Sequence, residues 1–242
     1  DNEHLLSVTL HHIIADGQSM EIIRRELFAL YSALTEGQAV SLPALPLHYI
    51  DVAAWQRGQA GEVAERRHLE YWRARLEGLP PLLTLPWDYS RPALQGHRGA
   101  RYAWKISPAI TEGLQETGKR YRVTPFMLLL SAFGILLSRY SRQSDFCIGT
   151  PVANRTGRDT EKLVGCFVNT VALRLDLNGD PSFPDFLRQV RTTVLEAQAH
   201  QELPFERLVE ELGVARDLGH TPLFQVMFVL EEAPSEATRL AD

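Results

Sequence analysis

Cysteine is scarce in this chain of 242 residues, which contains two, Cys147 and Cys166. Their separation does not match the short spacings of metal-binding cysteines. Such sparse use of cysteine fits a reducing compartment. We therefore expect a cytoplasmic protein without a cysteine-based metal site.

Excess positive charge and long apolar stretches are also lacking. The chain has 25 Lys and Arg against 30 Asp and Glu, for a formal charge of -5, and no basic stripe. This balance argues against a nucleic-acid partner. The longest apolar run, residues 126–137, is broken by Ser131 and Gly134 and is too short to span a bilayer, so we expect no membrane partner.

What the chain does have is an alternation of strand-like and helix-like segments. Short β-rich apolar runs predict strands, and apolar residues at helical spacing predict helices. The predicted strands cover residues 4–10, 99–106, 145–152, 168–175 and 222–230. The predicted helices cover residues 19–34, 49–55, 63–76, 107–121, 124–140, 182–199 and 204–212, and we expect Ser19 to cap the first. This alternation indicates an α/β fold.

The chemistry is concentrated in residues 11–17, which read HHIIADG at the end of the first predicted strand. An imidazole has an unperturbed pKa of about 6.5, which suits proton transfer near neutral pH. Asp16 is able to orient that site or to pair with a cation, and Gly17 allows the backbone angles of a sharp turn into a helix. On spacing alone the segment also fits an ordinary turn. It fits a zinc site less well, because no second cluster supplies further ligands.

The same segment resembles the H-H-x-x-x-D-G motif of condensation domains of nonribosomal peptide synthetases, which belong with chloramphenicol acetyltransferase and related acyltransferases. Five further segments resemble the family's motifs in the family's order: residues 49–55 (YIDVAAW), 148–155 (IGTPVANR), 165–170 (GCFVNT), 200–206 (HQELPFE) and 216–225 (RDLGHTPLFQ). Agreement in six segments along the chain makes coincidence implausible.

The chain also departs from the family. Val52 stands where the family usually has an aromatic residue, and His220 and Thr221 stand where many members have Arg and Asn. The second departure puts a substrate contact by that asparagine in doubt. The family has many more residues ahead of its His motif, whereas this chain has ten. We therefore expect the chain to be N-terminally truncated.

For the fold, the resemblance implies the two-lobed chloramphenicol acetyltransferase-like architecture, in which mixed sheets are flanked by helices and a tunnel lies between the lobes. Residues 1–95 are expected to be the remnant of the N-terminal lobe, with the His motif and a crossing segment. Residues 96–242 are expected to be the C-terminal lobe.

For the activity, the resemblance implies an acyltransferase that joins a donor acyl or peptidyl thioester to an acceptor aminoacyl thioester through an amide bond. Both substrates are carried on the 4'-phosphopantetheine arms of peptidyl carrier domains, and an adjacent adenylation domain belongs to the same synthetase. The domain itself is expected to bind no cofactor and no metal. The segments 11–17 and 165–170 look most like the type that joins two L-residues.

The resemblance assigns the catalytic group to His12, Asp16 and Gly17. His12 either takes the proton of the attacking amine or positions that amine and stabilises the charged intermediate. The backbone N–H of Gly17 is able to polarise the thioester carbonyl because a helix follows it.

Three more residues are expected to support this group. His11 is expected to pack beneath the site and hold the strand. Arg155 is expected to pair with Asp16 through a charge-assisted bond. Asn169 lies in an apolar strand and is either a structural bridge or a substrate-facing contact.

Rival functions are a coenzyme A-dependent acyltransferase, an epimerisation domain and a non-catalytic recruiting module. The five later segments argue against the first, and the residues 200–206 argue against the second. The intact His12 and Asp16 argue against the third. We expect the 242-residue chain by itself to be inactive in condensation.

Overall fold

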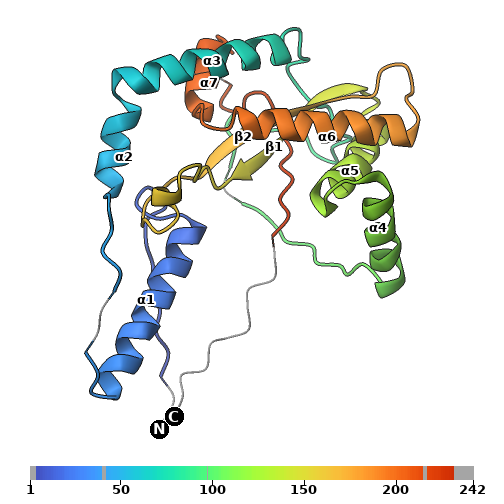
Figure 1. Cartoon of the computed structure of the whole chain (residues 1–242). Coiled ribbons are helices and arrows are strands. Elements are labelled where there is room, and N and C mark those ends of the chain that lie inside the picture. The colour runs from blue at the N-terminus through green and yellow to red at the C-terminus, as the bar shows by residue number, and fades with distance from the viewer. Residues whose placement is uncertain (1–3, 40–41, 97, 215–216, 232–242) are drawn as a thin grey trace. The chain divides into compact units, whose positions relative to one another are not determined.

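The computed structural model describes residues 4–39, 42–96, 98–214 and 217–231 (Figure 1). Arg216, which belongs to the last motif, lies outside the described residues. The chain divides into two compact units, each assembled from separate stretches. Among the described residues, the first unit takes those within 4–66 and 152–169, and the second unit takes those within 67–151 and 170–231. The lobe boundary expected near residue 95 stays a prediction.

The first unit is built on α1 (Gly17–Thr35), followed by α2 (Tyr49–Gln56). The carboxylate of Asp51 accepts a hydrogen bond from the N–H of His48 at 2.8 Å, which satisfies a free donor at the start of α2. The unit also contains the connection between the two strands, where a single 3₁₀ turn, η1 (Arg158–Thr160), is formed.

The second unit holds the remaining helices and most of the sheet. Its helices are the C-terminal part of α3 (Gln59–Leu76), then α4 (Pro108–Tyr121), α5 (Pro125–Ser141), α6 (Phe183–Ala199) and α7 (Phe205–Glu211). Ser107, Thr124 and Ser182 cap α4, α5 and α6, because each side chain accepts a hydrogen bond from a backbone N–H three residues on. A proline follows within the first two positions of each helix, where its missing N–H costs nothing.

The sheet is centred on two paired strands, β1 (Asp145–Val152) and β2 (Asn169–Asp176). The N–H of Leu177, just past β2, donates to the carbonyl of Ser144, just before β1, at 2.6 Å. The end of β2 therefore lies beside the start of β1, and the strands run antiparallel. Met227 forms an isolated parallel bridge with Gly149 of β1, so the pairing is mixed.

The core of the second unit lies between this sheet and the helices α5 and α6. Leu130, Ile148 and Val190 are fully buried. Gly134 allows α5 to approach β2, because a Cβ atom there would lie 2.6 Å from the Leu175 side chain. The predicted α/β class is confirmed.

Two predicted strands are wrong, and a third is reduced to a bridge. Residues 4–10 and 99–106 form no strand, because no described segment pairs with their backbone and a strand needs such a partner. Of residues 222–230, Met227 alone forms the bridge to β1. The helices α1 to α7 all lie where apolar spacing predicted them.

No single helix among the described residues is long and apolar enough to cross a bilayer. The helices α4 and α5 reach that length and hydropathy only together, and they are bent by 106° at their junction.

Candidate functional site

The H-H-x-x-x-D-G segment forms a turn and the start of α1. The N–H of Ile14 donates to the carbonyl of His11 at 3.1 Å, which closes the turn. Asp16 is extended (φ -99°, ψ -178°), and its Oδ1 accepts the N–H of Ser19 at 2.8 Å. Asp16 is therefore the N-cap of α1, and the prediction that Ser19 caps this helix is wrong. Aspartate is as favoured an N-cap as serine, so Asp16 directly ahead of Gly17 was the sequence signal for this cap.

The carboxylate of Asp16 forms a buried ion pair with Arg155. One guanidinium nitrogen, Nη2, lies 2.9 Å from Oδ1 and 3.1 Å from Oδ2. The side chains of Arg155 and Asp16 are 3% and 5% exposed. The expected pairing is confirmed, and it joins the His motif to the loop that follows β1.

Arg155 also fixes the shape of its own loop. Its Nη1 donates to the carbonyl oxygens of Thr160 and Leu163 at 2.6 and 2.7 Å. The guanidinium lies 4.1 Å from the centre of the Phe167 ring, within the range of a cation–π contact. One arginine thus connects the aspartate, the loop around η1 and an aromatic ring. A lysine lacks the planar, forked geometry for this role.

Ser19 is a residue of this network that the motifs did not identify. Its hydroxyl is fully buried and lies 2.7 Å from Asp16 Oδ1 and 2.8 Å from the carbonyl oxygen of Gly165. The single hydroxyl proton is donated to one of these two acceptors. The same hydroxyl accepts the N–H of Gly165 at 3.0 Å. The N–H of Phe167 donates to Asp16 Oδ2 at 3.1 Å. The 165–170 segment is therefore tied to the first turn of α1.

These contacts set the ionisation of Asp16. Burial by itself raises the pKa of the carboxyl group, but the hydrogen bonds from Ser19, from the Phe167 N–H and from Arg155 outweigh it. The pKa of Asp16 therefore lies below its usual value. The carboxylate stays charged near neutral pH and holds the turn in place.

Tyr49 supports the same loop from α2. Its hydroxyl donates to the carbonyl of Cys166 at 2.9 Å, and its ring meets Phe167 edge to face at 5.1 Å. A Cβ atom on Gly165 would lie 2.3 Å from the Tyr49 ring, so the close approach needs glycine. The 49–55 segment thus has a direct structural link to the site, whereas Trp55 is 56% exposed and is not core.

His12 lies on the surface of the turn, four residues ahead of Asp16 in the chain. Its imidazole is exposed, and Nδ1 lies 3.9 Å from the sulfur of Cys166, beyond the distance of a strong hydrogen bond. His11 is exposed as well, and its Nδ1 accepts the N–H of Ile13 at 3.1 Å. In this chain the turn directs His11 outward, and its expected place beneath the site stays a prediction.

Gly17 and Asn169 complete the set of predicted residues. Gly17 is the first residue of α1, so its N–H has no acceptor within the helix. It does not have a positive φ, and a Cβ atom there would meet nothing within 4 Å. The expectation that Gly17 provides unusual backbone angles is therefore wrong. Asn169 is half-buried at the start of β2, two residues after Phe167, and its role stays a prediction.

The arrangement places an exposed imidazole on a turn that is rigidly held. The turn that carries His12 is fixed at its end by a buried ion pair, a serine and two backbone hydrogen bonds. These contacts limit the motion of the turn that carries the imidazole. The N-terminus of α1 follows this turn in the chain. These features suit acyl transfer, which needs a proton-exchanging group and a donor for a developing oxyanion. An α/β fold with this site defines the class of chloramphenicol acetyltransferase-like proteins.

A sequence model of the condensation domain matches residues 1–240, so the chain belongs to the condensation-domain family. It is 48% identical over 240 residues to one of the linear gramicidin synthase proteins of Brevibacillus parabrevis. That match covers 99% of this chain and 3% of the synthase protein.

Solved structures of the family share the fold. The four-domain nonribosomal peptide synthetase AB3403, bound to AMP and glycine, superposes with a TM-score of 0.82 at 29% identity, over 93% of this chain and 17% of that one. The X-domain from teicoplanin biosynthesis, solved in complex with OxyB, gives a TM-score of 0.81 at 31% identity. This match covers 90% of this chain and 49% of that one. The chain thus spans about half the length of that X-domain.

Proposed function

We propose that this chain acts in a condensation domain that joins two carrier-bound substrates through an amide bond. The observation that carries the proposal is the exposed His12, held four residues ahead of a buried Asp16 that is fixed to Arg155. The kinship with a linear gramicidin synthase and with a nonribosomal peptide synthetase supports the substrate class.

In the proposed reaction, the amine of the acceptor attacks the thioester carbonyl of the donor. The C–N bond forms as the carbonyl oxygen gains negative charge, and the intermediate then expels the donor's phosphopantetheine thiolate. The acceptor nitrogen loses a proton, and the departing sulfur gains one. His12 either transfers this proton or positions the amine and stabilises its charge. The N–H of Gly17 is a candidate donor to the oxyanion.

The site residues divide by role in this proposal. His12 and Gly17 face the reacting atoms, whereas Asp16 and Arg155 hold the turn. Asn169 is either a structural bridge or a substrate contact. The substrates arrive on donor and acceptor carrier domains of a synthetase that also contains an adenylation domain. We infer L-configuration at both reacting residues from the segments 11–17 and 165–170.

The test replaces His12 by alanine and measures amide formation from loaded donor and acceptor carriers. Because the chain spans about half of the solved X-domain, the 242 residues are joined to the complementary half of a condensation domain. The 242-residue chain alone is expected to give no product. We expect His12→Ala to lose most activity, since general acid–base catalysis contributes about 10²–10⁴-fold. A variant with wild-type activity would overturn the role of His12.

His11→Ala is the matched control. His11 is the neighbouring imidazole of the same turn and has no role in the proposed chemistry, so we expect activity to fall far less than in His12→Ala, and the melting temperature shows any loss of stability. His12→Gln separates the two roles of His12, because glutamine forms hydrogen bonds but cannot accept the proton. If His12→Gln retains activity, the role of His12 is to position the amine and not to transfer the proton.

Two further donors are tested in parallel, one supplied as acyl-coenzyme A and one of D-configuration. Both should give less product.

A second candidate function is partner binding without catalysis. The teicoplanin X-domain was solved as a complex with OxyB, and this chain is 31% identical to it. The two candidates differ at His12. A domain that only binds a partner should show no amide formation in the wild type, and His12→Ala should leave its partner binding intact.

A further inference from the structure

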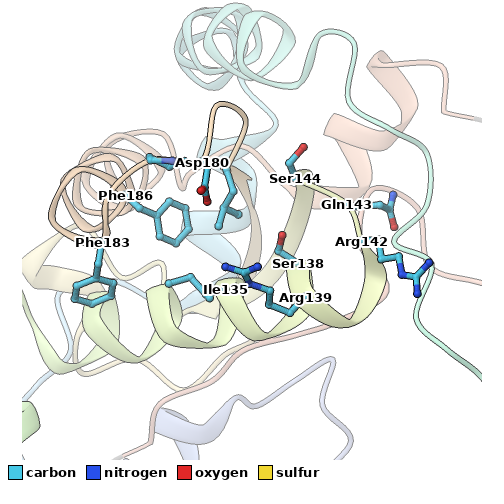
Figure 2. A pocket seen from close by; sticks show the side chains of 11 residues that line it. Ile135, Ser138, Arg139, Arg142, Gln143, Ser144, Asp180, Phe183 and Phe186 are labelled. Carbon is cyan, nitrogen blue, oxygen red and sulfur yellow. The ribbon is translucent and has the colours of Figure 1, made fainter.

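A cavity of about 470 Å³ lies in the second unit, between the end of α5 and the start of α6 (Figure 2). Its volume falls within the range of small-molecule sites, about 300–1,000 Å³. One wall is a face of α5, and the other is the turn after β2 together with the first turn of α6. The residues that matter here are Ile135, Arg139, Arg142, Asp180, Phe183 and Phe186.

Three charged side chains line this cavity without a partner. Arg139, Arg142 and Asp180 are exposed, and they form no ion pair or side-chain hydrogen bond with any described residue. Figure 2 shows Arg139 on α5 and Asp180 on the facing turn.

Two other polar side chains of the lining, Gln143 and Ser144, are already engaged. The side chain of Gln143 accepts the N–H of Thr84 at 2.6 Å and donates to the carbonyl of Leu82 at 2.9 Å. The hydroxyl of Ser144 donates to Asn178 at 2.6 Å. Figure 2 shows the side chain of Arg142 directed away from the other two charges, so Arg139 on one wall and Asp180 on the other are the unpaired charges most available to a ligand.

Apolar side chains line the space between these charges. Phe186 is 1% exposed and is anchored against α5 close to Gly134. Phe183 is partly exposed, and Ile135 is half-buried. A partly exposed ring beside unpaired charges offers a surface for a ligand that has both an apolar body and ionic groups.

We propose that this cavity binds a free apolar α-amino acid in its zwitterionic form. The guanidinium group of Arg139 matches the ligand carboxylate, since arginine binds carboxylates through paired hydrogen bonds. Asp180 matches the ligand ammonium, and Phe183 with Ile135 matches the apolar side chain. A ligand with a carboxylate but no ammonium leaves Asp180 unpaired, and a ligand with an ammonium but no carboxylate leaves Arg139 unpaired.

The test titrates the 242-residue chain with L-phenylalanine, 3-phenylpropionate and 2-phenylethylamine, followed by calorimetry. Each of the last two probes lacks one of the charges. We expect saturable binding of phenylalanine and weaker binding of both analogues. Arg139→Gln should reduce the affinity for phenylalanine about tenfold or more, because a charged hydrogen bond is lost. Asp180→Asn should reduce it as well and should narrow the preference for phenylalanine over phenylpropionate.

Arg191→Gln is the control, since Arg191 is an exposed arginine of α6 that does not line the cavity. It should leave the affinity unchanged. Melting temperatures of all variants show whether each is folded, and the two substitutions on opposite walls test the site independently. No saturable binding of phenylalanine, equal affinity for phenylpropionate, or wild-type affinity in both Arg139→Gln and Asp180→Asn would overturn the proposal. The measurement needs no turnover, so its result is independent of the proposed function.

Discussion

Arg155 Nη2 lies between the two carboxylate oxygens of Asp16, 2.9 Å from one and 3.1 Å from the other, with both side chains almost fully buried. The two residues are 139 positions apart in the chain. Asp16 begins the helix that follows the His motif, and Arg155 holds the loop after β1. This pair therefore helps to fix the position of the turn that carries His12, together with Ser19 and the Phe167 N–H.

Removing one partner of this pair should be costly. Arg155→Leu leaves the Asp16 carboxylate buried without its counter-charge, and such a loss costs about 3–5 kcal/mol of unfolding free energy. Urea denaturation measures the change. The double variant Asp16→Asn/Arg155→Leu should lose less than the sum of the single variants, because neither partner is left charged alone. Additive losses would contradict direct coupling.

An exposed ion pair provides the comparison. Arg188 and Asp185 are 2.9 Å apart, but their side chains are 72% and 52% exposed. Exposed pairs contribute about 0–1 kcal/mol. Arg188→Leu should therefore change the unfolding free energy far less than Arg155→Leu does. A loss as large as that of Arg155→Leu would mean that burial does not explain the difference.

The pKa of Asp16 predicts how this stabilisation varies with pH. The pKa is lower in the folded state than the value of about 3.9 expected for an unfolded chain. The unfolded state then binds more protons below about pH 3.9, so the stabilisation is complete above that pH and is lost as the pH falls through the folded pKa. The difference in unfolding free energy between wild type and Asp16→Asn should be constant from about pH 7 to 5 and should shrink below about pH 4. A difference that grows toward acid pH would contradict the assignment.

Gly165 and Gly17 should respond oppositely to the same substitution. A Cβ atom on Gly165 would lie 2.3 Å from the Tyr49 ring, whereas one on Gly17 would meet nothing within 4 Å. Gly165→Ala should lower the unfolding free energy by about 1–3 kcal/mol, as overpacking does. Gly17→Ala should leave it unchanged or raise it slightly, because alanine favours the helix. Thermal unfolding of both variants checks this. Equal losses of stability would show that the Tyr49 ring does not restrict residue 165 to glycine.

The helices could be predicted because their signals are local. Ser107, Thr124 and Ser182 each stand just before a helix with an early proline, and each is found as the cap. Strands are different, since a strand exists only when another backbone segment pairs with it. Residues 145–152 matched β1 at both ends, whereas the equally strand-like residues 4–10 have no described partner.

The site could be predicted in part for a related reason. The pairing of Asp16 with Arg155 followed from the family's motifs and from the charge of an arginine that comes directly after an apolar strand. The position of Ser19 between Asp16 and Gly165 did not, because a serine near a helix start is equally suited to capping. The outward direction of His11 depends on how the turn closes, which spacing alone does not determine.

Two histidines of the second unit lie in direct contact. The Nδ1 atoms of His68 and His200 lie 3.0 Å apart, and Glu202 lies 3.7 Å from His68 Nε2. One Nδ1 must donate and the other accept, so full protonation of both rings breaks this hydrogen bond and places two positive charges side by side. Tyr71 stacks on His200 at 4.0 Å and helps to bury it. Burial, His68 and the nearby Arg67 lower the pKa of His200 in that order, and Glu196 opposes them.

Because this pKa is lower in the folded state, the unfolded chain binds more protons below its own pKa of about 6.5. The stability contributed by the neutral His200 is thus present above about pH 6.5 and falls as the pH drops from there through the folded pKa. We expect the unfolding free energy of the wild type to decline between about pH 7 and 5, and His200→Gln to remove part of that decline. His4→Gln, which changes an exposed histidine outside this contact, is the matched control. If His200→Gln shows the same decline in unfolding free energy as the wild type, the titration of His200 does not cause that decline.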